Sequence, residues 1–230
     1  MSTTATHTAP SPNSRKMLVA MVGIGVLCAL LIVVTYEGTL PRVERLKAEA
    51  LENAIFQVLP GTATTVALQL TDDEQLQPLG DAKATGDVIY AGYGEDGQLV
   101  GFAIPAGGQG YADIIRILYG YDPNKEALVG FYVLESKETP GLGDKIDKDE
   151  GFLANFDALD VSVTDDGSAL KNTVIPVKNG EKENPWEVDC ITGATISSRA
   201  VGNTLGSSTA RWIPLLHQQK DALATMPENN

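Results

Sequence analysis

The strongest constraint on this chain is an uncharged stretch near its N-terminus. Met17 to Tyr36 carries no charged residue. A helix of about twenty residues, rising about 1.5 Å per residue, spans roughly 30 Å, the thickness of a bilayer's hydrocarbon layer. The competing interpretation is a cleaved signal peptide, whose apolar region is about 7–15 residues long and ends in an Ala-x-Ala-like site. Residues 34–38 offer no such site, so we expect a retained membrane anchor.

The charges beside the apolar stretch predict its orientation. Arg15 and Lys16 precede it, which favours a cytoplasmic N-terminus. Three basic residues between positions 42 and 47 weaken this rule, although glutamates are interspersed with them. We therefore expect a single-pass protein of the cell inner membrane, with its large domain outside the cytoplasm. In a Gram-negative cell that compartment is the periplasm.

Composition excludes several classes of function. The formal net charge is −13, and the only charged residues among the first sixteen are basic, so the remainder is more acidic still. Nucleic-acid binding needs a positive patch and is not expected. Cys28 lies in the apolar stretch, far from Cys190, which makes a disulfide between them implausible. His7 and His217 stand near opposite ends, without the context of a metal site or a catalytic triad.

The predicted organisation has five parts. They are a disordered cytoplasmic tail (1–16), a transmembrane helix (17–36), a juxtamembrane helix (37–61), a folded domain (62–225) and a frayed tail (226–230). Pro41 predicts a break or kink between the two helices, and Pro60-Gly61 ends the second.

The folded domain is predicted to be α+β, with antiparallel β hairpins packed by helices. A strand over 62–70 and a linker over 79–86 precede two hairpins, 87–93 with 98–105 and 114–119 with 127–135. A glycine-rich loop over 106–111 lies between the hairpins, and its spacing is not that of a dinucleotide-binding motif. The later elements are a short helix (148–156), a strand pair (161–164 with 173–178), a helix from 195 to about 212, ended or kinked by Pro214, and a final helix (215–224).

The stretch Asp189 to Ser198 carries the most chemical information. Gly193 and Ala194 are small and let the backbone approach a bulky ligand. Hydroxyl side chains, that of Thr195 among them, then stand at an expected helix N-terminus, whose free N–H groups and partial positive charge suit a phosphate. The alternative is an ordinary capped turn, which local physics alone favours.

A second constrained loop, Glu138-Thr139-Pro140-Gly141-Leu142-Gly143, lies upstream. Pro140 fixes one backbone dihedral, and Gly141 and Gly143 permit positive φ. Such a loop can hold backbone N–H groups against a planar ligand. Alone, it would be interpreted as a tight turn after a strand.

Together these two stretches resemble the FMN-binding domain family. Asp189 to Thr195, Asp-x-x-Thr-Gly-Ala-Thr, is similar to that family's flavinylation signature, and Glu138 to Gly143 is similar to a second family stretch in the same order. The family's fourth signature position is often Ser, and Thr192 keeps the hydroxyl. The resemblance covers most of the chain beyond the first forty residues. It implies that Thr195 carries FMN through a phosphoester bond.

The resemblance also implies roles for neighbouring residues. Asp189 would act in recognition by a flavin transferase or in placing a metal during transfer, with a strand-end role as the alternative. The residues expected around the cofactor are Thr192, Gly193 and Ala194 on the phosphate side and Glu138, Thr139, Leu142 and Gly143 on one side of the ring, with Leu142 packing on a ring face.

The implied function is that of an electron-relay subunit and not a complete enzyme. The family includes members of Rnf-type complexes, which couple electron transfer between ferredoxin and NAD to ion translocation, and of sodium-pumping quinone reductases. The soluble domain of this chain is the shorter of the two family versions, which favours the Rnf type. Expected partners are the other membrane subunits and, since no histidine lies near Thr195, a separate flavin transferase. The alternatives are an anchored extracytoplasmic binding or assembly module without flavin, and a flavin domain of an unrelated electron-transfer system.

Overall fold

The computed structural model describes residues 14–71, 73–80 and 87–226, in two units that divide after Glu49. The first unit holds most of helix α1 (Ser14–Val58), which runs through Pro41 and so joins the two helices expected over 17–36 and 37–61. Its apolar side chains, Met17 to Tyr36, are exposed, and length and composition allow this helix to cross a membrane. The tail residues 1–13 and 227–230, and the linker residues 81–86, lie outside the described part.

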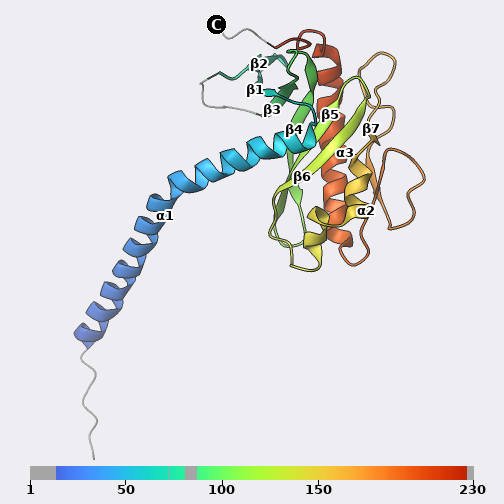
Figure 1. Cartoon of the computed structure of the whole chain (residues 1–230). Coiled ribbons are helices and arrows are strands. Elements are labelled where there is room, and N and C mark those ends of the chain that lie inside the picture. Colours follow the sequence, from blue (N-terminus) through green and yellow to red (C-terminus); the bar gives the residue numbers. More distant parts are fainter. Residues whose placement is uncertain (1–13, 72, 81–86, 227–230) are drawn as a thin grey trace, which may run out of the picture. The chain divides into compact units, whose positions relative to one another are not determined.

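The second unit is built on a seven-stranded antiparallel sheet with the order β2-β1-β3-β4-β5-β6-β7 (Figure 1). The strands are β1 (Thr64–Leu70), β2 (Leu76–Pro78), β3 (Val88–Tyr93), β4 (Leu99–Gln109), β5 (Ile114–Asp122), β6 (Ala127–Glu135) and β7 (Leu159–Asp160). Both predicted hairpins are confirmed. The glycine-rich segment differs from the prediction, because Ala106 to Gln109 continues β4 and pairs with β5 instead of forming a loop.

The helical elements and a small second sheet follow the large sheet in the chain. They are η1 (Gly143–Asp147), α2 (Glu150–Leu153), η2 (Ala154–Phe156), β8 (Ile175–Val177), β9 (Glu187–Asp189) and α3 (Thr195–Gln219). The predicted strand pair 161–164 with 173–178 is wrong: β8 pairs in parallel with β9, and Val163 makes only an isolated bridge to Leu170. Local alternation cannot identify a partner strand that lies further along the chain.

Side-chain alternation gives the sheet two buried faces. On β5, Ile117 and Tyr119 join the main core, whereas Leu118 points to the opposite face and packs with the end of α1, around Val58. Gly120 lies so close to the Val58 carbonyl that a side chain there would collide with it. The end of α1 is therefore a structural part of the folded domain.

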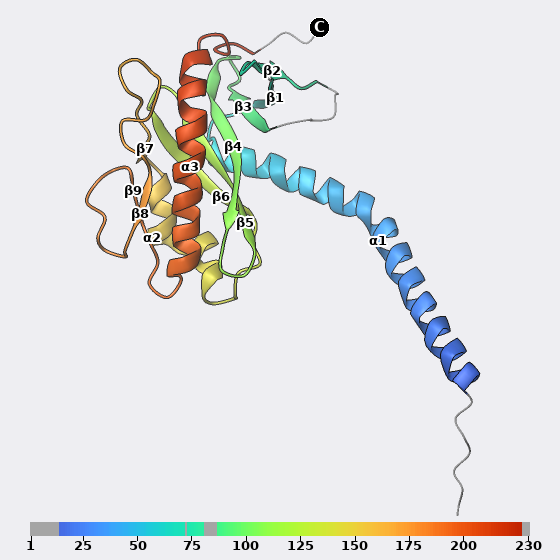
Figure 2. The ribbon, with the colours of Figure 1, turned by 180° about the vertical axis from the view of Figure 1, so that it is seen from behind.

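Helix α3 runs along the other face of the sheet (Figure 2). Its apolar face includes Val201, Leu205 and Ile213, each at most 1% exposed. Pro214 was expected to end or kink the helix, yet α3 continues to Gln219. The lost backbone hydrogen bond is tolerated because Pro214 and its neighbours are buried against the sheet.

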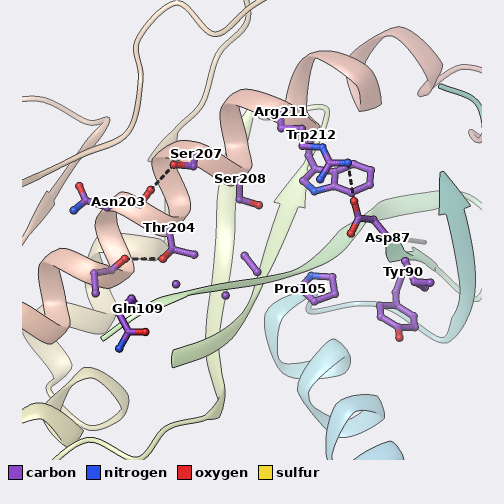
Figure 3. A pocket seen from close by; sticks show the side chains of 15 residues that line it. Asp87, Tyr90, Pro105, Gln109, Asn203, Thr204, Ser207, Ser208, Arg211 and Trp212 are labelled. Carbon is purple, nitrogen blue, oxygen red and sulfur yellow. Dashed lines mark hydrogen bonds and ion pairs between the residues drawn. The ribbon is translucent and has the colours of Figure 1, made fainter. Parts of the chain in front are cut away.

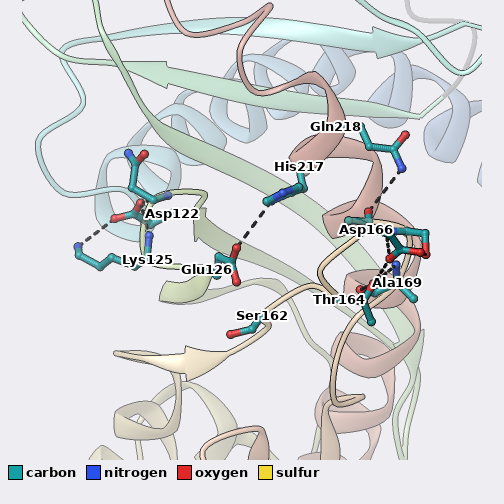
Figure 4. Close-up of polar contacts among 12 residues, drawn as sticks. Asp122, Lys125, Glu126, Ser162, Thr164, Asp166, Ala169, His217 and Gln218 are labelled. Atoms are coloured by element: carbon teal, nitrogen blue, oxygen red, sulfur yellow. Dashed lines mark hydrogen bonds and ion pairs between the residues drawn. The ribbon is translucent and has the colours of Figure 1, made fainter.

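Polar contacts hold the C-terminal half of α3 (Figure 4). His217 lies 3.9 Å from Glu126 of the β5–β6 turn, and the Gln218 amide donates to the Gly167 carbonyl at 3.4 Å. In the same turn as Gly167, Asp166 accepts from the Thr164 hydroxyl at 2.6 Å, which lowers the pKa of that carboxyl. The Gln218 hydrogen bond ties the end of the helix that lies away from Thr195 to the turn at Gly167.

Candidate functional site

A tight turn separates β9 from α3 and determines where the helix begins. The Ala194 N–H donates to the Ile191 carbonyl at 3.1 Å, and Gly193 adopts a φ of 84°, which favours glycine. The Ser198 hydroxyl donates to the Ala194 carbonyl at 2.9 Å and accepts from the Ile191 N–H at 3.1 Å. Thr195 is consequently the first residue of α3.

The N-terminus of α3 has no side-chain cap. Its N-cap residue is Ala194, which has no hydroxyl or carboxyl to offer, and the first helical hydrogen bond joins the Ser198 N–H to the Ala194 carbonyl at 2.9 Å. Among the described residues, no acceptor is found for the N–H groups of residues 195–197. Thr195 itself is exposed, with its hydroxyl 3.4 Å from the Ile191 carbonyl. Three unpaired donors and the helix dipole favour an anionic group here.

The Glu138 to Gly143 loop forms a turn against this helix end. The Leu142 N–H donates to the Thr139 carbonyl at 3.1 Å, with Gly141 at a φ of 77°. Positive φ was expected at Gly143 as well, but this glycine is required for space. A Cβ there would lie 2.6 Å from a Glu138 carboxylate oxygen and 2.8 Å from the Ser197 hydroxyl.

Glu138 is a buried carboxylate, 6% exposed, with a partner for each oxygen. Oε1 accepts from the Ala112 N–H at 2.9 Å, and Oε2 accepts from the Ser197 hydroxyl. Glu138 therefore joins the β4–β5 turn to the first turn of α3. A buried charge with fewer hydrogen bonds would be costly.

The two sequence stretches meet in one cavity of about 450 Å³. Its lining residues are Tyr111, Glu138, Thr139, Leu142, Gly143, Gly193, Ala194, Thr195, Ile196 and Ser197. Seven of the nine residues proposed from the sequence are among them. The sequence reasoning did not assign Tyr111, Ile196 or Ser197 to the cofactor; the glycine-rich segment before Tyr111 was the signal that could have identified this residue.

Two residues proposed from the sequence do not line the cavity. Thr192 is exposed on the turn. Asp189 accepts a hydrogen bond from the Gly180 N–H at 2.8 Å, while its own N–H donates to Asn155 at 3.0 Å. The Asp189 side chain thus closes the loop between β8 and β9, in keeping with the strand-end role.

The cavity has the properties that FMN requires. An anionic phosphate suits the unpaired N–H groups of α3, and a flat aromatic ring suits the side chains of Tyr111, Leu142 and Ile196, which are 68%, 52% and 58% exposed. Gly193 leaves the backbone open, since a Cβ there would meet nothing within 4 Å. Among the described residues, no cluster of His, Cys, Asp and Glu suits a metal ion.

A larger hollow, about 820 Å³, lies between the flank of α3 and β3 and β4 (Figure 3). None of the nine proposed residues lines it. Its charged groups already have partners: Arg211 pairs with Asp87 at 2.6 Å and lies 5.1 Å from the ring centre of Trp212. Along the helix, the Thr204 hydroxyl donates to the Ala200 carbonyl at 2.7 Å.

Known proteins with similar sequences share this domain. Residues 110–208 match the family described as FMN-binding domain. The G subunit of the ion-translocating oxidoreductase complex of Methanosarcina acetivorans is 29% identical over 205 residues, which cover 86% of this chain and 94% of the relative. The G subunit of the Na(+)-translocating ferredoxin:NAD(+) oxidoreductase complex of Acetobacterium woodii is 26% identical, over 80% of this chain and 84% of the relative.

Solved structures share the fold. Shewanella oneidensis NqrC has a TM-score of 0.57 and 19% identity, over 73% of this chain and 87% of that chain. The C subunit of the Na(+)-translocating NADH-quinone reductase from Parabacteroides distasonis has a TM-score of 0.54 and 21% identity, over 81% of this chain and 98% of that chain. Both likenesses concern the architecture alone. The sequence match, by contrast, spans the β4–β5 turn, the Glu138 to Gly143 loop and the first half of α3, and so this part of the chain is similar to the FMN-binding domain family.

Proposed function

We propose that this chain is the membrane-anchored FMN subunit of an Rnf-type complex, with FMN joined to Thr195 by a phosphoester bond. The chain is an electron-transfer subunit with an FMN-binding domain, similar over most of its length to the G subunits of such complexes. One observation carries the assignment of the residue: Thr195 is an exposed hydroxyl at an uncapped helix N-terminus, inside a cavity with an apolar rim.

The residues of the cavity divide the work of holding FMN. The N–H groups at the start of α3 receive the phosphate, and Gly193 and Ala194 let the backbone come close to it. Leu142 and Thr139 line the cavity and would hold the ring. When bound, FMN supplies reversible electron transfer at its isoalloxazine ring, which the surrounding groups tune.

Attachment needs help from another protein. A threonine hydroxyl is a weak nucleophile without an adjacent base. His217 belongs to the far end of α3, and among the described residues the partner of the Thr195 hydroxyl is the Ile191 carbonyl, which is not a base. A flavin transferase therefore provides the base. Thr195 Oγ1 forms the new bond to the phosphorus of an activated FMN donor, the hydroxyl proton passes to that base, and the donor's leaving group departs from phosphorus. Exposed Thr192 and the Asp189 turn offer the transferase its recognition surface.

The membrane placement follows from α1. The exposed apolar half of this helix supports a single-pass protein of the inner membrane. The similarity of the chain to subunits of ion-translocating complexes supports the same placement. Arg15 and Lys16 favour a cytoplasmic N-terminus, which puts the FMN domain in the periplasm of a Gram-negative cell. A C-terminal alkaline phosphatase fusion, which is active only outside the cytoplasm, should be active. An inactive but stably expressed fusion would reverse the orientation.

The test of covalent attachment compares two isosteric substitutions in the same helix. Thr195→Val and Thr204→Val proteins are expressed in full length with a flavin transferase. The wild type and Thr204→Val should give a fluorescent band on a denaturing gel and the added mass of FMN, whereas Thr195→Val should give neither. Covalent flavin on Thr195→Val would contradict the assignment.

A dark wild-type band from a transferase-competent host would favour the alternative function, an anchored binding or assembly module without flavin. Co-purification of the other membrane subunits separates the Rnf-type assignment from a flavin domain of an unrelated system. Their absence from a complex purified under mild conditions would contradict the Rnf-type assignment but not the flavin.

A further inference from the structure

Tyr111 is more exposed than the described tyrosines of the sheet strands. It belongs to the turn between β4 and β5, which the Gly110 N–H closes by donating to the Asp113 carbonyl at 2.9 Å. Tyr111 is 68% exposed and lines the cavity of Thr195, whereas Tyr93 and Tyr119 are fully buried. A large aromatic side chain held at the mouth of a cavity is a contact surface for a ligand.

The turn that carries Tyr111 is anchored on both sides of this residue. Ala112 donates its N–H to Glu138 at 2.9 Å, and Asp113 pairs with the Lys137 ammonium at 2.5 Å. Asp113 also accepts from the Ile114 N–H at 2.8 Å. The backbone beneath the Tyr111 side chain is therefore fixed to the segment that follows β6.

Glu138 extends this anchoring to the site of attachment. Its second oxygen accepts from the Ser197 hydroxyl, two residues beyond Thr195. Gly110 and Gly143 pack so tightly on the carboxylate that a Cβ at either would lie 2.6 Å from one of its oxygens. The turn of Tyr111, the buried carboxylate and the first turn of α3 thus form one connected unit.

We infer that Tyr111 packs against the isoalloxazine ring of FMN carried by Thr195, and that Glu138 is a positioning residue that holds Tyr111 there. This inference rests on the proposed function and names the side chain that contacts the ring. Glu138 acts through these two hydrogen bonds, one from the turn of Tyr111 and one from the first turn of α3.

The fluorescence lifetime of the bound flavin tests the contact. A phenol touching a photoexcited isoalloxazine ring gives it an electron, which then returns, so that the fluorescence is quenched. Tyr111→Leu should lengthen the lifetime several-fold, and Tyr111→Trp should keep it short. Tyr132→Leu is the matched control, because Tyr132 is 37% exposed on β6 and does not line the cavity. A wild-type lifetime in Tyr111→Leu would overturn the contact.

The role of Glu138 is tested with the same measurement. Glu138→Gln can still accept from the Ala112 N–H and bond to the Ser197 hydroxyl, so its lifetime should match the wild type. Glu138→Ala loses both bonds, and its lifetime should approach that of Tyr111→Leu. Where Glu138→Ala does not fold, Ser197→Ala is used in its place. It removes only the hydrogen bond between Ser197 and Glu138, so it should give an intermediate lifetime. A wild-type lifetime in the folded variant would overturn the positioning role.

The flavin content of each sample is measured first, by intact mass. Wild-type protein without FMN on Thr195 would overturn both the proposed function and the role of Tyr111. Fully flavinylated Tyr111→Leu with an unchanged lifetime would overturn the role of Tyr111 alone and leave Thr195 as the attachment site.

Discussion

Two of the hollows that border α3 differ in whether their polar groups already have partners. In the larger one, along the helix flank, Asp87 and Arg211 form an ion pair, and Ser208 hydrogen-bonds the Tyr119 hydroxyl at 2.8 Å. In the smaller one, at the helix N-terminus, Thr195 is exposed and the first-turn N–H groups lack acceptors among the described residues. The proposed binding site is therefore distinguished from the larger hollow by unsatisfied donors beside exposed apolar side chains, and not by its size.

After the loss of covalent flavin in Thr195→Val, the largest expected effect is that of Glu138→Ala on folding. This change leaves the Ala112 N–H and the Ser197 hydroxyl without their buried charged acceptor. We expect a loss of roughly 3–6 kcal/mol of unfolding free energy, because two hydrogen bonds are lost and each bond to a charged group contributes about 1.5–3 kcal/mol. Urea unfolding measures it, with Glu138→Gln as control. Equal stability of Glu138→Ala and wild type would show that the two hydrogen bonds to Glu138 do not stabilise the smaller hollow.

Two glycine substitutions compare one crowded position in the smaller hollow with one open position in the larger hollow. Gly143→Ala puts a methyl group 2.6 Å from Glu138 and should cost about 1–3 kcal/mol as overpacking, with less flavin attached. Gly107, which lines the larger hollow, has its nearest neighbour for such a methyl group at 3.7 Å. Gly107→Ala should cost less than Gly143→Ala and leave the flavin content unchanged. A larger loss of thermal stability in Gly107→Ala than in Gly143→Ala would contradict this comparison.

A smaller effect is expected from the ion pair of the larger hollow. The side chains of Asp87 and Arg211 are both more than half exposed. Asp87→Asn should therefore change the unfolding free energy by less than about 1 kcal/mol, and less again at high salt. Attached flavin, measured by absorbance, should equal that of the wild type. A marked loss of flavin would assign the larger hollow a role in cofactor binding.

The smallest effect concerns pH and the turn beneath Tyr111. The Lys137 ammonium lowers the pKa of Asp113 below its ordinary value. The stabilisation is therefore complete above the unfolded-state pKa of about 3.9 and is lost as the pH falls through the lowered folded-state value. Asp113→Asn should lose less stability than wild type below about pH 4 in acid unfolding titrations. Identical acid profiles would show that this pair contributes nothing.

Much of the fold could be predicted because its signals are local. Alternating apolar residues and glycine-containing turns identify β3 to β6, and the uncharged run identifies the membrane-type part of α1. The pairing of β8 with β9 could not be predicted, since the choice of partner depends on contacts distant in sequence. The prediction that Pro214 ends or kinks the helix was wrong for the same reason. Burial against the sheet outweighs one missing backbone hydrogen bond, and α3 continues to Gln219.

Some features of the candidate site are likewise local in sequence, and others depend on contacts between distant segments. The sequence by itself determined the turn and the hydroxyl at the start of α3, because a turn that needs Gly193 and a hydroxyl at Thr195 are properties of adjacent residues. Only the tertiary structure decided that Tyr111 lies at the cavity, that Asp189 bonds to Gly180 and does not line the cavity, and that both oxygens of Glu138 have partners. Those facts depend on where β4, β9 and α3 meet in space, and the free energy that brings them together comes from burying side chains far apart in the chain.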